Sequence, residues 1–320
     1  MYLSAERMAV ANKAIQETFE QTSVAWQAIP HWDIGDPGQV WVRSDVVTTP
    51  ERPDPFGGDS LDVMKEWVRF YVTVAQACAP TPDALLAAVV PRTVDLAQRV
   101  DEYVFIALRN NATSFDGELT APVYAQELLD ALIDTRVKVE DVGYRAPSCL
   151  LTSKAALKAL SHLVGGVPVT NSLLSAANIN SLHRVRALDE PQGPIVLHRG
   201  DDNGNNGGKA NDNGGNGGKA NGNDTNGGKA NDNDTNGDDD ETARIMLLLG
   251  RLQRIAHGGA AAASPGEEPV DLAVSVPPSL EVIGDTKQDY IELAVRMRYA
   301  LRIKDERGVV AVDYTYPRTS

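Results

Sequence analysis

Residues 207–240 read GGKANDNGGNGGKANGNDTNGGKANDNDTNGDDD, and this stretch constrains the fold more than any other feature of the chain. The unit GGKAN begins at Gly207, Gly217 and Gly227, with almost no apolar residue between the repeats. Such a segment buries too little apolar surface to offset the entropy lost on ordering, so its composition predicts a disordered or turn-rich linker. The folded core must therefore come from the residues on either side of it.

The bulk composition of the chain is that of a globular protein. With 320 residues and 42% hydrophobic side chains, it can form one large domain or two ordinary ones. The formal net charge of -14 argues against a nucleic-acid groove, which needs clustered lysine and arginine. No signal peptide and no run of about 18 apolar residues is present, so the sequence predicts no membrane association. Cys78 and Cys149 stand apart from any Cys/His cluster, as expected of reduced thiols in a cytoplasmic protein.

The part of the chain before residue 120 predicts two helices and an arm. Helix formers and apolar spacing predict a helix over residues 5–26. Alternating residues predict strands over 40–47 and 66–77, joined by a Pro/Gly-rich excursion, which together form an extended arm with little core of its own. A long helix is predicted over 83–110, kinked or divided at Pro91. Its apolar stripe consists of Leu86, Val90, Val94, Ala97, Val100 and Val104.

The rest of the chain mixes helices with strands and ends in strands, so we predict the α+β class and not a regular βαβ repeat. After the repeat, residues 241–256 are interpreted as a helix whose apolar stripe packs on the body of the protein. The other predicted helices are 122–138 and 154–164, and the predicted strands are 146–153, 193–200, 269–276, 280–285, 290–305 and 308–314.

No motif of the common catalytic routes is present, whether a glycine-rich phosphate loop, a zinc-binding HExxH, a GxSxG nucleophile or a paired CxxC. The acidic residues Asp95, Asp101 and Glu102 on the long helix are interpreted as a solvated face. The sequence therefore predicts no enzyme and no cofactor. The histidines match no metal-ligand spacing; they are His31, His162, His183, His198 and His257.

The repeat contains one pattern that resembles a calcium loop. Asp232, Asp234 and Asn236 stand at positions 1, 3 and 5, and Gly237 stands at position 6, where such a loop turns sharply. Position 12 is Ala243, so the usual bidentate glutamate is missing. An Asn/Asp-rich repeat produces this spacing easily, and chance is the preferred interpretation.

Three segments near the C-terminus resemble one protein family. They are IVLHRG at 195–200, VDLAVSV at 270–276 and YIELAVRMRYALRIKDERGVVAVDY at 290–314. Together they resemble the C-terminal part of encapsulins, the bacterial nanocompartment shell proteins with the HK97 phage capsid fold. Residues 95–121 resemble the end of that family's spine helix, and residues 40–77 resemble its extended E-loop.

The resemblance implies an HK97-like capsid fold with a P-domain, an A-domain and a β-hairpin E-loop, and with the repeat as a surface insertion. It covers nearly the whole chain except about residues 201–268. The implied division is 1–37 for the N-terminal helix and arm, 38–79 for the E-loop, 80–147 for the P-domain with its spine helix, 148–200 for the A-domain, 201–268 for the insertion with a short helix, and 269–320 for the returning strands.

The resemblance also implies a function: a shell protein that assembles from many copies of itself into an icosahedral compartment in the bacterial cytoplasm and holds a cargo enzyme on its inner face. It implies no chemistry by the shell itself. The implied cargo-docking residues are Met8, Ala14, Ile15 and Phe19; the implied pore-loop residues are Ser175, Asn178, Asn180 and Ser181; the implied intersubunit residues of the E-loop are Trp41, Val47, Trp67 and Phe70.

Two other functions remain open from the sequence. A phage or prophage major capsid protein would share the fold and enclose a nucleic-acid genome, although the acidity of the chain gives no positive sign of DNA packing. A soluble enzyme or calcium-binding module would instead use the Asn/Asp repeat. The sequence leaves open the identity of the cargo and the number of subunits in a shell.

Overall fold

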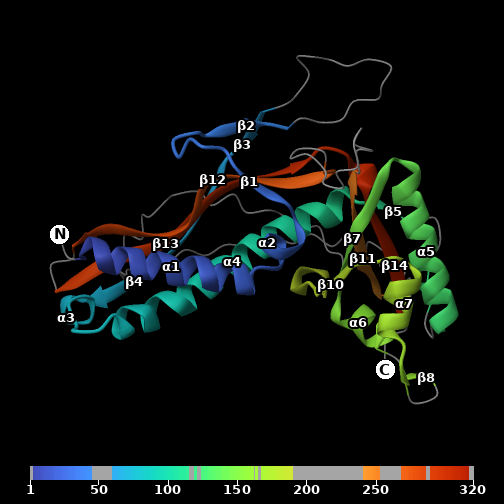
Figure 1. The fold of residues 1–320 in the computed structure, drawn as a ribbon, viewed down its shortest axis with the longest axis horizontal. Helices are drawn as coiled ribbons and strands as arrows, with labels where there is room; N and C mark the ends of the chain where they lie inside the picture. The colour runs from blue at the N-terminus through green and yellow to red at the C-terminus, as the bar shows by residue number, and fades with distance from the viewer. Residues whose placement is uncertain are drawn as a thin grey trace, which may run out of the picture.

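The structure is a computed structural model that describes residues 3–44, 60–114, 119–120, 124–161, 163–164, 167–189, 241–252, 268–285 and 289–316. These residues form two parts, each with a β-sheet and covering helices (Figure 1). The first part contains α1 (Ala5–Thr22), α2 (Val24–Ala28), β1 (His31–Asp33), β2 (Trp41–Arg43), β3 (Ser60–Asp62), β4 (Met64–Thr73), α3 (Val74–Ala77), α4 (Asp83–Asn111), β12 (Val270–Asp285) and β13 (Tyr290–Ile303).

The sheet of the first part has four strands in the order β1-β12-β13-β4. Strand β13 pairs antiparallel with both β12 and β4, and the short β1 joins β12 in parallel. Because side chains alternate along a strand, the apolar residues of β13 from Ile291 to Tyr299 share one face. Helices α1 and α4 cover that face (Figure 1).

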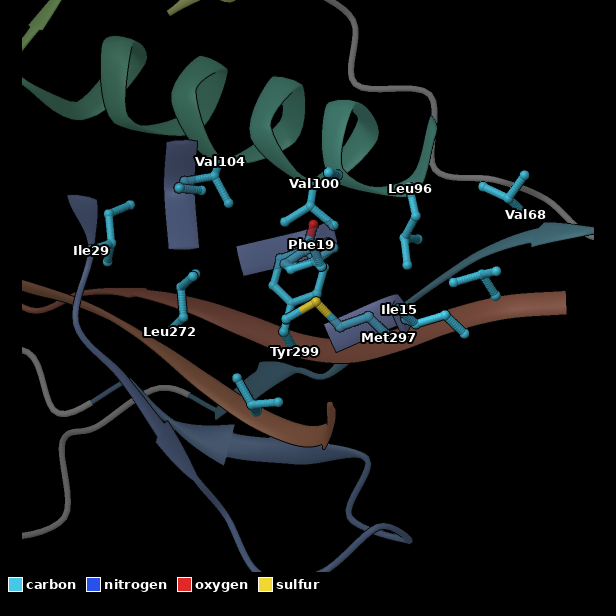
Figure 2. Packing of buried hydrophobic residues seen from close by; sticks show 14 of the residues in the cluster. Ile15, Phe19, Ile29, Val68, Leu96, Val100, Val104, Leu272, Met297 and Tyr299 are labelled. Atoms are coloured by element: carbon cyan, nitrogen blue, oxygen red, sulfur yellow. The ribbon is translucent and has the colours of Figure 1, made fainter. Parts of the chain in front are cut away.

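The core of the first part lies between these helices and the sheet. Figure 2 shows Phe19 of α1, Val100 of α4 and Tyr299 of β13 together in the layer between α4 and the sheet, and all three side chains are fully buried. Ile15 lies one helical turn away on the same face of α1 and is buried equally. The predicted N-terminal helix is confirmed over Ala5–Thr22, and its apolar stripe packs inward, whereas residues 24–26 belong to the separate short helix α2.

The long helix α4 is one element of 29 residues that runs through Pro91, so the predicted division at this residue is wrong. Pro91 is on the exposed side of the helix, where a proline costs mainly one backbone hydrogen bond. Packing of the helix against α1 and β4 outweighs that loss. The buried stripe before Pro91 is Leu85 and Val89, one residue earlier than predicted; from Ala97 onward it is as predicted.

Asp101 of α4 is not on a solvated face, which corrects the interpretation from sequence. Its carboxylate accepts hydrogen bonds from the Ser23 hydroxyl (2.6 Å) and from the backbone N–H groups of Val24 (2.8 Å) and Ala25 (2.9 Å). The first N–H groups of a helix have no partner within the helix, so Asp101 satisfies the start of α2 from a neighbouring helix. Burial raises the pKa of Asp101 despite these three hydrogen bonds.

The sheet of the second part has the strand order β10-β7-β11-β14-β5, with β6 also paired to β14. Helix α5 packs on the strands β7, β11 and β14. The elements of this part are β5 (Thr113–Ser114), β6 (Leu119–Thr120), α5 (Ala125–Asp141), β7 (Tyr144–Thr152), α6 (Lys154–Leu160), β8 (Leu163–Val164), β9 (Val167–Pro168), α7 (Thr170–Ala176), β10 (Ser181–Arg184), η1 (Arg186–Leu188), β11 (Glu241–Leu252), η2 (Glu306–Gly308) and β14 (Val309–Tyr316).

Strand β11 overturns the predicted helix over 241–256. It pairs antiparallel with β14 on one side and with β7 on the other, which makes it a central strand of this sheet. The run from Ile245 to Leu249 is continuously apolar, and such a short run fits a central strand as well as it fits a helix. Residues 241–252 therefore belong to the folded body and not to an insertion.

The predicted arm is also corrected. Strand β4 pairs with β13 along its whole length, from Met64↔Tyr299 to Thr73↔Tyr290, so it is part of the first sheet. Its alternate residues Val68, Phe70 and Val72 are buried in the core. Of the described residues in the predicted arm, β2 and β3 lie outside this sheet and pair antiparallel, with Val42 opposite Leu61. We call residues 40–44 and 60–63 the hairpin.

Candidate assembly site at the base of the hairpin

The hairpin packs on the face of the first sheet that α1 and α4 leave uncovered. Val42 and Val63 of the hairpin form a small buried cluster with Ala273 of β12 and Ala300 of β13. The two alanines are paired across the strands, and alternation places them opposite the helix-covered face. We call this alanine pair the seat, because its small side chains allow the hairpin to approach the sheet closely.

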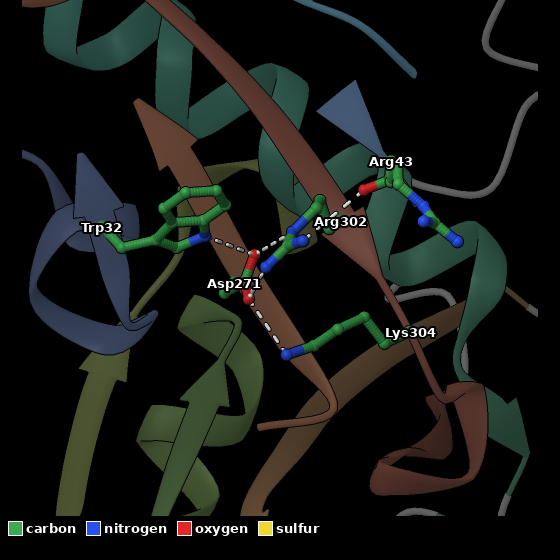
Figure 3. Close-up of polar contacts among 5 residues, drawn as sticks. All are labelled: Trp32, Arg43, Asp271, Arg302 and Lys304. Atoms are coloured by element: carbon green, nitrogen blue, oxygen red, sulfur yellow. Dashed lines mark hydrogen bonds and ion pairs between the residues drawn. The ribbon is translucent and has the colours of Figure 1, made fainter. Parts of the chain in front are cut away.

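A buried ionic cluster lies beside the seat (Figure 3). Arg302 donates to both carboxylate oxygens of Asp271, from Nε to Oδ1 (2.7 Å) and from Nη2 to Oδ2 (2.6 Å). Lys304 Nζ lies 3.0 Å from Asp271 Oδ2, and the indole Nε1 of Trp32 donates to Oδ1 at 3.4 Å. Arg302 Nη1 also donates to the backbone carbonyl of Arg43 in the hairpin (3.5 Å). The carboxylate thus connects β12, β13 and β1, and Arg302 extends the cluster to the hairpin.

The charges of Asp271, Arg302 and Lys304 interact strongly because their side chains are almost completely buried. Burial by itself would raise the pKa of Asp271, but the hydrogen bonds and positive charges of Arg302 and Lys304 outweigh it and hold the pKa below its usual value. The guanidinium carbon of Arg302 also lies 4.8 Å from the ring centroid of Trp32, in cation–π geometry. Removing the Asp271 carboxylate would leave the buried positive charges of Arg302 and Lys304 without this partner, and breaking a buried ion pair in this way costs about 3–5 kcal/mol.

The local sequence explains why β13 contributes side chains to both faces of the first sheet. In RYALRIK, residues 298–304, Tyr299, Leu301 and Ile303 alternate with Arg298, Ala300, Arg302 and Lys304. The first set packs against or lies in the helix-covered core, and the second set faces the hairpin. Sequence reasoning missed Asp271, Arg302 and Lys304 as members of a buried ionic cluster beside the hairpin. The available signal was charged residues at every second position of an otherwise apolar strand.

The predicted intersubunit residues have different positions in the structure. Trp41 in the hairpin is 53% exposed, next to Val40 at 60%. Trp67 is half-buried on β4, with Lys65 Nζ at 3.9 Å and the Arg69 guanidinium carbon at 4.0 Å from its ring centroid. Phe70 is in the core and is therefore not available to a neighbour, because it points to the helix-covered face. Val47 lies outside the described residues.

The predicted cargo-docking residues are all on α1 but do not form one exposed surface. Ile15 and Phe19 are fully buried, so their assignment to a docking surface is wrong: their side chains complete the core of this subunit. Met8 and Ala14 are half-buried. Their role in docking stays a prediction.

The predicted pore-loop residues extend from Ser175, near the end of α7, to Ser181, the first residue of β10. Asn178 has a left-handed backbone (φ 55°), which asparagine tolerates better than most residues. Asn180 exchanges two hydrogen bonds with the backbone of Ser148, each of 3.0 Å, and Ser181 pairs with Cys149. Ser175, Asn178 and Asn180 are exposed and Ser181 is half-buried. The loop is held in place by β7, and its role at a pore stays a prediction.

The remaining predictions concern a calcium loop, metal ligands and membrane-spanning helices. Asp232, Asp234 and Asn236 are in the segment that the structure does not describe. In the described parts of the chain, no three His, Cys, Asp or Glu side chains are grouped as metal ligands. Among the same residues, no helix combines the length and the apolar character needed to cross a membrane.

Comparison with known proteins shows the fold. No family model and no curated protein matches the sequence. Among solved structures, the virus-like particle from Pyrococcus furiosus is 11% identical, with a TM-score of 0.57 over 96% of this chain and 98% of that chain. A phage-related protein from Bordetella bronchiseptica is 9% identical, with a TM-score of 0.50 over 97% of this chain and 96% of that chain. The chain therefore has the HK97-like fold of capsid shells, as predicted from the C-terminal segments.

Proposed function

We propose that this chain is the repeating subunit of a closed protein shell and has no catalytic chemistry of its own. The observation that carries this proposal is the likeness to the Pyrococcus furiosus virus-like particle, which extends over nearly the full length of both chains. A likeness confined to one domain would leave room for an added activity, whereas this one accounts for the whole described body. Fold alone does not define function, so the proposal also needs a surface suited to assembly.

The hairpin supplies such a surface. Its base is anchored by buried contacts, whereas Val40 and Trp41 leave apolar side chains in solvent. Aromatic residues such as tryptophan are enriched at the centres of protein interfaces, where they bury a large area at low entropic cost. We propose that Trp41 inserts into an apolar surface of a neighbouring copy, and that the domain division implied by the family applies to this chain with β11 included in the A-domain.

The enclosed content is a cargo protein in this proposal, and the shell is a compartment of the bacterial cytoplasm. The formal net charge of -14 supports it, because a surface that lines a nucleic-acid genome gains from lysine and arginine. Exposed positions of α1, together with the half-buried Met8 and Ala14, would contribute the docking surface. Ser175 to Ser181 would line a pore.

A phage-type capsid is the second candidate, and the likeness to the phage-related protein from Bordetella bronchiseptica favours it. The two candidates differ in content. Particles purified after nuclease treatment should contain a second polypeptide and no protected nucleic acid if the first candidate holds. Protected nucleic acid without a cargo polypeptide would support the capsid instead.

The assembly surface is tested by two variants at one position. Trp41→Glu places a charge where the proposal requires an apolar contact, and we expect it to leave soluble, folded subunits that do not form particles. Trp41→Phe keeps an aromatic surface and should assemble. Negative-stain microscopy and sedimentation give the readout; particle formation by Trp41→Glu at the wild-type level would contradict a role for this side chain.

A further inference from the structure

A second arginine of β13 also binds the chain that leads into the hairpin. Arg298 donates from Nη1 to the carbonyl of Pro37 (2.8 Å) and from Nη2 to the carbonyl of Gln39 (3.3 Å). Four residues further along the strand, Arg302 donates to the carbonyl of Arg43. Both arginines are on the same face as Ala300, because residues at even spacing along a strand share a face.

The two arginines therefore hold the entering chain at separated points. Four residues of an extended strand span about 13 Å, and the seat residue Ala300 lies halfway between the two arginines. After Ile34, whose N–H donates to the carbonyl of Val274 in β12 (2.9 Å), the turn between β1 and β2 has short internal hydrogen bonds, such as Gly38 N–H to Asp36 Oδ1 (2.8 Å). Those internal hydrogen bonds shape the turn, and the contacts of Arg298 tie it to the sheet beyond Ile34.

We propose that Arg298 and Arg302 act as a two-point clamp that sets the direction in which the hairpin leaves the subunit. This inference rests on the proposed function, because the direction of an intersubunit arm determines the angle between neighbouring copies and thus the size of a closed shell. Both residues are positioning residues. Arg302 is fixed by Asp271, so its own geometry is rigid, and Arg298 supplies the second point that prevents rotation about the first.

Arg296 provides the matched control. It is on the same face of β13, two residues before Arg298, and it pairs with Glu281 of β12 (2.9 Å). Among the described residues, it makes no hydrogen bond or ion pair to the hairpin or to the chain that leads into it. Replacing either arginine by methionine removes a positive charge and keeps most of the apolar stem. Only Arg298→Met removes contacts to the chain that leads into the hairpin.

The experiment compares hydrogen exchange and particle size in the full-length protein. In Arg298→Met we expect backbone amides of residues 39–43 and 61–63 to exchange about 10-fold faster, because the variant loses a hydrogen bond from a charged group. Amides of α4 and β13 should stay protected. Particles should form with a broader or shifted distribution of diameters. Arg296→Met should match the wild type in both measurements.

Equal exchange in the hairpin and equal particle diameters for Arg298→Met and Arg296→Met would overturn the clamp. If the wild type forms no particles, the proposed function fails, but the exchange comparison still tests whether Arg298 fixes the hairpin. If Arg298→Met does not fold, Arg298→Lys replaces it: a single donor on a flexible stem should give intermediate exchange, and wild-type exchange with wild-type diameters would contradict the two-point requirement.

Discussion

Ala300 of β13 lies opposite Ala273 of β12, and the hairpin packs on this pair through Val42 and Val63. The same two alanines therefore pair the strands, support the hairpin and lie at the base of the proposed assembly surface. A larger side chain in either strand would leave the helix-covered core intact but would lift the hairpin from the sheet.

Replacing Ala300 by leucine should therefore impair assembly more than folding. The added side chain overfills the seat, which costs typically about 1–3 kcal/mol, and it displaces the hairpin from its anchoring contacts. We expect a modest fall in the unfolding midpoint and a loss of particles, measured by thermal denaturation and sedimentation. Ala300→Ser, which stays small, should assemble; normal particles from Ala300→Leu would show that the seat does not position the hairpin.

The ionic cluster predicts loss of stability in acid. The pKa of Asp271 is lower in the folded chain than in the unfolded chain, so its contribution is complete above its unfolded value near pH 4 and is lost as the pH falls through the folded value. Asp271→Asn should lower the free energy of unfolding by about 3 kcal/mol at pH 7. The difference between wild type and variant should shrink below about pH 4. A difference that is constant with pH, or larger in acid, would count against this account of the cluster.

Tyr299 predicts a stabilising substitution. Burial raises the pKa of its hydroxyl well above the usual value, so the group stays protonated, and it has no hydrogen-bond partner among the described residues. An unsatisfied buried polar atom costs about 1–3 kcal/mol, so Tyr299→Phe should raise the free energy of unfolding by about 1 kcal/mol. Tyr299→Leu should instead destabilise by about 2 kcal/mol or more, because it leaves a cavity against Tyr103 and α1. Denaturant titration of both variants distinguishes these effects; destabilisation by Tyr299→Phe would indicate a partner for the hydroxyl.

The two cysteines should differ in reactivity. Burial raises the pKa of the Cys149 thiol to about 11, although Ser181 partly opposes the shift, whereas Cys78 is exposed. Since the thiolate is the reacting species, Cys149 should resist alkylation at pH 8 until the chain unfolds. Mass spectrometry of peptides after brief iodoacetamide treatment measures both sites. Rapid alkylation of Cys149 in the native protein would contradict its burial in β7.

Elements with a single strong pattern could be predicted from the sequence. The helix over 5–26 and the helix over 83–110 were recognisable because their apolar residues recur at helical spacing, and β13 because its residues alternate. Residues 241–252 were misassigned because a short apolar run fits both a helix and a central strand. Only the pairing with β7 and β14, which are distant in sequence, decides between them.

The candidate site could be predicted only in part. Trp41 was assigned to an interaction surface and is exposed, so its role there stays a prediction. Phe70, Ile15 and Phe19 were also assigned to interaction surfaces but are core residues. An apolar residue on a helix or strand can face a partner or the subunit itself, and local sequence does not distinguish the two. The partners in the ionic cluster could not be assigned for a related reason: Trp32 and Asp271 are separated by 239 positions. Charged residues at alternate positions of a strand indicate a charged face, but they do not identify its partner.

The central claim is that the folded chain is a repeating unit of a shell, and the mass of the purified full-length protein in dilute solution tests it most directly. Sedimentation velocity combined with negative-stain microscopy should give hollow closed particles of megadalton mass, with no large pool of single subunits. A folded, stable species that sediments at the 34.4 kDa of one chain at every concentration tested would contradict the account.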